Sequence, residues 1–179
     1  MGELLQTPSQ TVGPFFAYSL TPHQYNYDFT NLLDGNLVKE DRVGERIQII
    51  GQVIDGNGDL IPDALIELWQ SDSQAIARFG TGTDAQNRFI FQTIKPQSVE
   101  GQAPHINVIV LMRGLLVHAF TRIYFSDETE ANAKDDVLQS VPEDRQATLI
   151  AQKTVQNGQT IYTFNILMQG DDETVFFDV

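Results

Sequence analysis

The residues with the clearest chemical potential are His105 and Asn107, in the stretch Ala103-Pro104-His105-Ile106-Asn107 that opens the most apolar run of the sequence. If this run is a strand, side chains alternate between its faces, so His105 and Asn107 point the same way. That spacing is a usual way to offer a metal ion two ligands. Here the second residue is a neutral amide, and no cysteine or third histidine nearby completes a site. The remaining histidines are His23 and His118, and we assign no role to His118. A histidine on a strand face is more often packed and hydrogen-bonded, so the stretch resembles a metal-site strand without predicting a metal.

The composition limits the classes of partner. The 179 residues suffice for one domain with a substantial core, and the hydrophobic fraction of 41% and charged fraction of 20% are typical of a soluble globular protein. The absence of cysteine excludes disulfides, thiolate metal sites and cysteine nucleophiles. A formal net charge of -13 argues against nucleic acid or anionic membrane as a partner, because phosphates are held by clustered lysines and arginines. An anionic ligand would need a locally placed arginine.

The chain carries no targeting signal that we can identify. Its first residues lack the basic start and long apolar run of a signal peptide. No stretch approaches the ~20 apolar residues that a membrane span needs. We therefore expect a cytoplasmic protein without a membrane partner.

Short apolar segments separated by turn signals predict a mainly β fold. Trp69 ends one of these segments and is expected in the core. Residues 71–86 are polar and glycine-rich and are expected to form a loop, whereas residues 127–140 and 142–150 favour short helices. Strands are expected over residues 46–54, 64–70, 87–93, 106–112, 115–125, 149–155 and 160–168. The pattern predicts one domain over residues 1–179, an antiparallel β-sandwich with long loops and one or two short helices.

Both ends of the chain carry features of contact surfaces. Residues 1–20 contain prolines and a glycine with little periodicity, and we expect them to form an extended N-terminal arm. The pairs Phe15-Phe16 and Phe176-Phe177 are costly to leave in water and should be covered. Residues 18–44 read as a long surface loop, and such loops are usually functional or interfacial.

Several segments together resemble the intradiol ring-cleavage dioxygenases. They follow one another in that family's order: Gly51-Gln52-Val53-Ile54-Asp55-Gly56-Asn57-Gly58, Ala64-Leu65-Ile66-Glu67-Leu68-Trp69-Gln70, Thr93-Ile94-Lys95-Pro96, Ala103-Pro104-His105-Ile106 and Thr121-Arg122-Ile123-Tyr124-Phe125. The opening segment Thr7-Pro8-Ser9-Gln10-Thr11-Val12-Gly13-Pro14 and the closing segment Glu173-Thr174-Val175-Phe176-Phe177-Asp178 narrow the resemblance to the α-subunit type of the family's two-chain members. The resemblance covers nearly the whole chain.

The resemblance implies a non-haem Fe(III) held by two tyrosinates and a His-x-His pair on one strand. Phenolate oxygen suits a hard ferric ion, and imidazole completes the set. This chain has Asn107 at the second histidine position, Val99 near one tyrosine position and Ala77 near the other. No tyrosine occurs between Tyr27 and Tyr124. We therefore expect this chain to bind no metal, with the Fe(III) held by a partner β-subunit.

The same resemblance implies a homologous, iron-binding β-subunit, αβ protomers in a larger oligomer, and a substrate pocket between the two chains. Residues matching Thr11, Gly13, Pro14, Phe15 and Arg122 line that pocket from the α side. A Gly-Pro turn lets backbone approach an aromatic ring closely. Arg122 offers a carboxylate a bidentate, permanently charged partner. An arginine on a strand face in water is the commoner case, but the family position and the acidic background favour a binding role.

The implied reaction is cleavage of the small aromatic substrate protocatechuate (3,4-dihydroxybenzoate) by O2 between its hydroxyls, giving 3-carboxy-cis,cis-muconate. This chain would contribute no catalytic residue and would be inactive alone. The alternative is a non-enzymatic, transthyretin-like β-sandwich binding module, because the turn Asp55-Gly56-Asn57-Gly58 between two strands also fits such domains. That rival predicts a chain without an obligate partner, and it leaves the arm and Arg122 unexplained.

Overall fold

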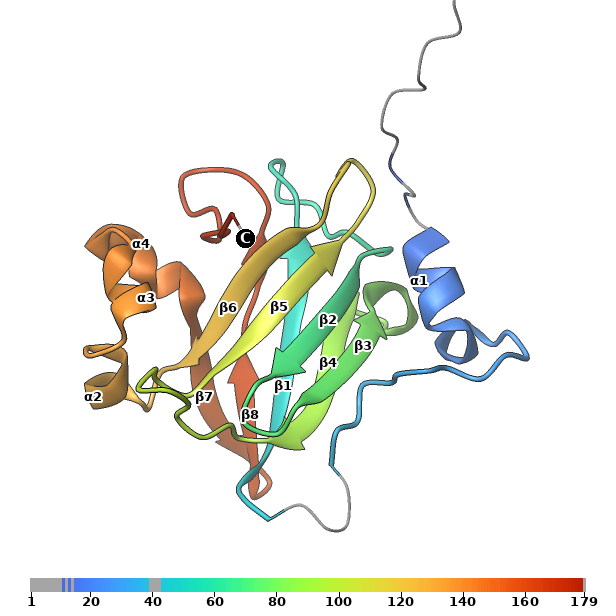
Figure 1. The fold of residues 1–179 in the computed structure, drawn as a ribbon. Helices are drawn as coiled ribbons and strands as arrows, with labels where there is room; N and C mark the ends of the chain where they lie inside the picture. The colour runs from blue at the N-terminus through green and yellow to red at the C-terminus, as the bar shows by residue number, and fades with distance from the viewer. Residues whose placement is uncertain (1–10, 12, 14, 39–42, 179) are drawn as a thin grey trace, which may run out of the picture.

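A computed structural model describes residues 11, 13, 15–38 and 43–178. Over these residues the chain is mainly β, and the strands form two facing layers (Figure 1). The strands are β1 (Arg46–Ile54), β2 (Leu65–Gln70), β3 (Ala75–Gly80), β4 (Arg88–Ile94), β5 (His105–Leu111), β6 (Ala119–Phe125), β7 (Ile150–Gln156), β8 (Gln159–Thr163) and β9 (Ile166–Leu167). Hydrogen bonds link them in the order β3-β2-β5-β6-β7-β8-β1-β4, with β9 on β1.

The helices are short and lie at the edges of the sandwich. They are α1 (Phe15–Leu20), α2 (Thr129–Asn132), α3 (Asp136–Ser140) and α4 (Glu143–Gln146), with 3-10 turns at Pro22–Tyr25, Thr81–Thr83 and Ala147–Leu149. Helices α2, α3 and α4 lie beside β6 and β7, whereas α1 lies at the opposite edge beside β3 (Figure 1). The helices predicted over residues 127–140 and 142–150 are therefore present, each broken into shorter turns.

The core lies between the two layers, where alternate residues of each strand meet. On β5, Ile106, Val108 and Val110 are fully buried, and on β4 Phe89 and Phe91 are. The residues between them face outward, as the period of two requires. Burial of these aliphatic and aromatic side chains is the dominant favourable contribution to folding.

The predicted fold class, mainly β with a few short helices, is confirmed, although the sheet is mixed rather than purely antiparallel. Strands β6 and β7 pair in parallel, as do β1 and β8. Parallel neighbours need a long connection, and the helical segment 126–149 between β6 and β7 supplies one.

Strand β3 was missed, because residues 71–86 were predicted to be a loop. It pairs with β2 along its length, from Leu65 opposite Gly80 to Gln70 opposite Ala75. Its inward residues, Ala75 and Ala77, are small, so they fill space against the core with little hydrophobic signal in the sequence. Gln74, with a φ of 48°, closes the turn that precedes the strand.

The two chain ends differ from each other. Residues 15–20 form helix α1 where an extended arm was predicted, and the Ser19 hydroxyl donates to the Phe15 carbonyl at 2.6 Å. The rest of the arm stays a prediction, since residues 1–10, 12 and 14 lie outside the described residues. At the other end Phe176 and Phe177 pack on the core, and the Phe177 N–H donates to the Phe120 carbonyl at 2.8 Å. The expected cover is therefore confirmed for Phe176 and Phe177, whereas Phe15 is 68% exposed in this chain.

Candidate functional site

Strand register places Trp69, Asn107 and Arg122 in one row across three neighbouring strands. Trp69 on β2 lies opposite Asn107 on β5, and Asn107 lies opposite Arg122 on β6. Ile76 on β3 extends the row beyond Trp69. Directly opposite side chains on one face are about 5 Å apart at their Cβ atoms, so these four are neighbours. The row lies on the outer face of its layer, away from the core.

This row forms the floor of a pocket of about 370 Å³. Its lining residues are Glu67, Leu68, Trp69, Ile76, Asn107, Ile109, Phe120 and Arg122. Most are apolar or aromatic, and a small number of polar groups converge on the space, which is the usual make-up of a small-molecule site. Trp69 is 40% exposed, so its predicted place in the core was wrong. Its neighbour Leu68 takes the inward position of β2 instead.

Arg122 is held at one end of its guanidinium. Its Nη1 donates to the Gln102 side-chain oxygen at 3.0 Å and to the Tyr124 hydroxyl at 3.3 Å. The Tyr124 hydroxyl in turn donates to Asp135 Oδ1 at 3.0 Å. Burial raises the pKa of Tyr124 to about 12, so it stays a neutral phenol. Arg122 shares a strand face with Phe120 and Tyr124, as the alternation along β6 requires.

His105 is a buried, hydrogen-bonded side chain. Its Nδ1 lies 2.8 Å from the Ala103 carbonyl oxygen, and its ring packs against Tyr124 with the centroids 5.7 Å apart. Burial lowers the pKa of His105, so the imidazole is neutral at ordinary pH and Nδ1–H donates to the carbonyl. His105 and Asn107 share one face of β5, as predicted. The Asn107 Oδ1 is buried and has no hydrogen-bond partner among the described residues.

The donor set beside His105 does not fit a ferric ion. In the described part of the chain, no three histidine, aspartate or glutamate side chains cluster as metal ligands would. Ala77 is fully buried and faces the core, so the residue of β3 that faces the pocket is Ile76. Val99 lies in a loop and forms a bridge with Gln102. None of these positions supplies the phenolate oxygens that ferric iron prefers.

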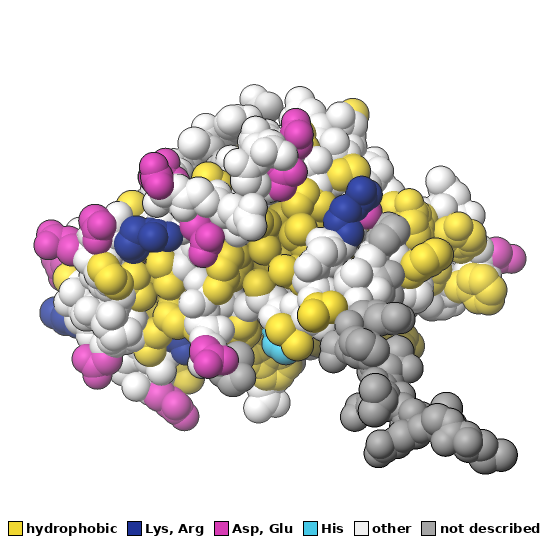
Figure 2. Space-filling view, turned by 90° about the horizontal axis from the view of Figure 1, so that it is seen from above, with side chains coloured by type: hydrophobic (Ala, Val, Ile, Leu, Met, Phe, Trp, Pro, Cys, Tyr) yellow, Lys and Arg dark blue, Asp and Glu magenta, His cyan; other side chains and the backbone are white. Residues whose placement is uncertain are grey.

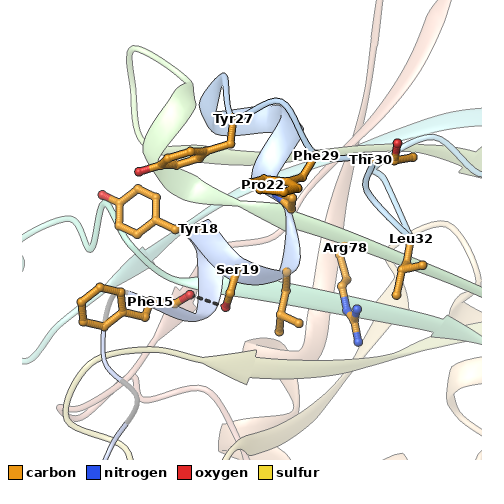
Figure 3. Close-up of a pocket in the computed structure, with 10 residues that line it drawn as sticks. Phe15, Tyr18, Ser19, Pro22, Tyr27, Phe29, Thr30, Leu32 and Arg78 are labelled. Carbon is orange, nitrogen blue, oxygen red and sulfur yellow. Dashed lines mark hydrogen bonds between the residues drawn. The ribbon is translucent and has the colours of Figure 1, made fainter.

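The arm residues line a different pocket, of about 500 Å³. Figure 3 shows the lining side chains, which come from α1, from residues 22–32 and from Arg78 of β3. The lining residues are Phe15, Tyr18, Ser19, Leu20, Pro22, Tyr27, Phe29, Thr30, Leu32 and Arg78. Arg78 forms an ion pair with Glu67, which lines the first pocket, so the two pockets adjoin at this pair. Within this chain Phe15 and Arg122 do not share a pocket.

The backbone before α1 has the turn that a Gly-Pro sequence favours. Gly13 has a φ of +65°, and its N–H donates to the Thr11 hydroxyl at 3.0 Å. Pro14 lies outside the described residues. A Cβ added at Gly13 would meet nothing within 4 Å, so the requirement for glycine here comes from its positive φ.

The surface carries the acidic excess that the composition predicts. Seen from above, apolar side chains form a broad area with acidic side chains spread around it (Figure 2). An anionic ligand therefore meets a generally repulsive field, and a guanidinium such as that of Arg122 has to supply the local attraction. Among the described residues, no helix has the length and apolar character that crossing a membrane requires.

Comparison with known proteins identifies relatives of the whole chain. No protein-family model matches the chain. The chain is 49% identical to the protocatechuate 3,4-dioxygenase alpha chain of Burkholderia cepacia, over 100% of both chains, and 39% identical to that of Pseudomonas putida, over 98% of both. It is 30% identical to the Burkholderia cepacia beta chain, over 79% of this chain and 72% of the relative.

A solved structure shares the fold. The intradiol ring-cleavage dioxygenase of Tetranychus urticae superposes with a TM-score of 0.61 at 17% identity, over 79% of this chain and 88% of that one. The shared fold indicates the intradiol dioxygenases in general, whereas full-length identity to two alpha chains identifies the subfamily. The chain belongs to the protocatechuate 3,4-dioxygenase alpha-chain family of intradiol ring-cleavage dioxygenases.

Proposed function

We propose that this chain is the non-iron-binding α-subunit of a protocatechuate 3,4-dioxygenase, and that it completes the substrate pocket together with a ferric β-subunit. The assembled enzyme would cleave 3,4-dihydroxybenzoate with O2 to 3-carboxy-cis,cis-muconate. The observation that carries the proposal is the row of Trp69, Asn107 and Arg122, which offers aromatic surface and a guanidinium where the family has its metal strand. The rival binding module has no such support, given the full-length identity to alpha chains.

The partner would be a homologous β-chain, in αβ protomers of a larger oligomer. The 30% identity to a relative named as a beta chain supports two chains of common fold. The Fe(III) would belong to the partner, because one imidazole and one amide are a poor ligand set for it. When bound there, the ferric ion supplies the oxidative chemistry of ring cleavage. This chain's residues bind and orient the substrate.

Arg122 would bind the carboxylate of protocatechuate. Its Nη1 is used by Gln102 and Tyr124, and in the described part of the chain its Nε and Nη2 make no hydrogen bond. That edge matches the two oxygens of a carboxylate. The apolar lining from Trp69 and Phe120 would exclude water from the ring and strengthen the charge-assisted bonds.

The residues Thr11, Gly13, Pro14 and Phe15 would reach the substrate from the α side once the partner is docked. The positive φ of Gly13 lets backbone approach an aromatic ring without a Cβ between them. Phe15 is 68% exposed, so its ring is free to contact a partner chain or a ligand. We propose that the two pockets of this chain mark two separate surfaces through which the α-subunit contributes to the shared substrate pocket.

The test is Arg122→Ala in the co-expressed αβ complex. A charge-assisted hydrogen bond is worth roughly 1.5–3 kcal/mol, so kcat/KM for protocatechuate should fall by about ten- to a hundredfold. Catechol, which lacks the carboxylate, should lose much less, and iron content should not change. The matched control is Arg113→Ala, an exposed arginine paired with Asp63 outside the pocket, which should leave both substrates unaffected. Equal turnover of protocatechuate by Arg122→Ala and wild type would refute the binding role.

A further inference from the structure

Tyr124 connects Arg122 to the helical segment at the edge of the sandwich. It is fully buried on β6, two residues from Arg122 on the same strand face. Its hydroxyl accepts from Arg122 Nη1 at 3.3 Å and donates to Asp135 Oδ1 at 3.0 Å. A phenol has one proton to donate, so donation to the acceptor-only carboxylate leaves the oxygen lone pair for the guanidinium. The direction of both bonds is therefore fixed.

Asp135 is a rigid anchor for this hydroxyl. It is fully buried, and it is the N-cap of α3, where Oδ1 accepts from the Leu138 N–H at 2.8 Å. Its second oxygen, Oδ2, accepts from the Ala103 N–H at 2.8 Å. Both carboxylate oxygens are thus held by backbone N–H groups of two different segments. A carboxylate bound in this way cannot turn, so the position of the Tyr124 hydroxyl is determined by the fold.

The contacts to Arg122 leave its ligand-binding edge open. Gln102 and Tyr124 both accept from Nη1, and this nitrogen carries two N–H groups that can serve both acceptors. A guanidinium presents a second edge through Nε and Nη2, in the plane of the group. With Nη1 fixed at two points, the plane and rotation of the guanidinium are fixed too. The Nε and Nη2 edge is then preorganised for a carboxylate in the pocket.

We propose that Tyr124 is a positioning residue for Arg122, anchored by Asp135, and that it sets the affinity of the site for carboxylate-bearing aromatic ligands. The proposal rests on the proposed function, since it requires Arg122 to bind the substrate carboxylate. Tyr124 itself does not line the pocket and need not touch the ligand. Tyr124 limits the conformations of the Arg122 side chain before the ligand binds. Arg122 then loses less rotamer freedom on binding, and less binding free energy is lost.

The experiment compares Tyr124→Phe with a matched control in the co-expressed αβ complex. Tyr124→Phe keeps the buried ring and removes only the hydroxyl. The control is Tyr162→Phe, because Tyr162 is also fully buried and its hydroxyl donates to a carboxylate, Asp127 Oδ1, at 2.8 Å in the other layer. Each variant loses one buried tyrosine–aspartate hydrogen bond. Only the first of the two bonds leads to Arg122.

We expect Tyr124→Phe to raise KM for protocatechuate by roughly three- to tenfold, which is the value of one hydrogen bond, with kcat unchanged. KM for catechol should stay at the wild-type value in the same variant. Tyr162→Phe should leave KM for both substrates unchanged, whatever it does to the melting temperature. In the double variant Arg122→Ala/Tyr124→Phe, removal of the hydroxyl should have no further effect on protocatechuate, since the two residues act as one unit.

The outcomes separate this inference from the function on which it rests. If Arg122→Ala impairs protocatechuate turnover but Tyr124→Phe behaves like Tyr162→Phe, the positioning role is wrong and the proposed function stands. An equal rise in KM for catechol and protocatechuate would also overturn it, because that result reports a general distortion. If Arg122→Ala has no effect, both the binding role and the positioning role fall.

Discussion

Asn107 and Arg122 lie directly opposite each other on β5 and β6, and both side chains line one pocket. At the position where the resemblance implies a second histidine ligand, this chain carries an amide, and the cross-strand neighbour of that amide carries a guanidinium. Placing a permanent positive charge beside a metal cation would be unfavourable, so this arrangement suits an anionic ligand better than a ferric ion. The amide of Asn107 and the positive charge of Arg122 therefore both favour an anionic ligand in this pocket over a metal ion.

The first prediction is that Asn107→His does not create an iron site. The variant supplies a second imidazole beside His105, but Ile76 and Val99 still provide no phenolate oxygen, and Arg122 remains opposite. The isolated variant chain should contain no stoichiometric iron by metal analysis. It should also lack the visible tyrosinate-to-iron absorption. A coloured chain with one iron per molecule would show that the remaining donors suffice.

The parts of this site that could be predicted from the sequence are those that depend on patterns within one short segment. Strand β1 was predicted with its bounds, residues 46–54, and His105 and Asn107 were correctly placed on one face. Strand β3 was missed because Ala75 and Ala77 satisfy packing without hydrophobic bulk. Ala77, which the resemblance placed near a tyrosine ligand position, faces the core, and its neighbour Ile76 lines the pocket.

Other features depend on pairings that no local pattern encodes. The parallel pairs β6–β7 and β1–β8 join residues that are distant in sequence, so periodicity could not reveal them. Trp69 was placed in the core because it ends an apolar segment, and only its pairing opposite Asn107 shows that its side chain lies on the outer face. Likewise, the contact from Asp135 through Tyr124 to Arg122 becomes visible only when α3 is docked on β6.

A second prediction concerns the apolar pocket beside α1. Phe29 and Leu32 are 70% and 90% exposed there, which is costly for a free subunit and suits an interface. Without a β-chain, the wild-type chain should self-associate in sedimentation velocity experiments. The double variant Phe29→Ser/Leu32→Ser should do so markedly less. Val117→Ser, at an exposed valine outside the pocket, is the control and should behave like wild type. A stable wild-type monomer would count against an interface here.

The third prediction concerns stability in acid. Asp127 accepts from Lys153 Nζ at 2.7 Å, Lys95 Nζ at 3.0 Å and the Tyr162 hydroxyl at 2.8 Å. Burial alone would raise the pKa of Asp127, but these three hydrogen bonds outweigh it and hold the pKa well below its usual range. A carboxyl whose pKa is lower in the folded state stabilises the fold above its unfolded pKa of about 4, and this contribution is lost as the pH falls below that value.

Asp127→Asn should therefore lower the free energy of unfolding at pH 7 by about 1–3 kcal/mol, since it weakens hydrogen bonds to charged groups. Between about pH 5 and 2 its stability should depend less on pH than that of the wild type. Urea unfolding of the αβ complex at several pH values measures both effects. Parallel stability curves for the two proteins would mean that another carboxyl carries the acid sensitivity.

The last prediction returns to the pair of Asn107 and Arg122. Asn107→Asp would place a carboxylate directly opposite the guanidinium, in a partly apolar pocket where the two charges would form an ion pair. This internal carboxylate would compete with the substrate carboxylate for the same Nε and Nη2 edge. We expect KM for protocatechuate to rise by about ten- to a hundredfold. Asn107→Leu removes the amide without adding charge, and it should cost much less.

Catechol distinguishes competition for Arg122 from damage to the pocket. Because it has no carboxylate, its KM in Asn107→Asp should stay close to that in Asn107→Leu. The ion pair should also raise the melting temperature of Asn107→Asp above that of Asn107→Leu, since the buried Asn107 oxygen has no partner among the described residues and the carboxylate would gain one. Equal losses for catechol and protocatechuate in Asn107→Asp would mean that Arg122 does not bind the substrate carboxylate from this pocket.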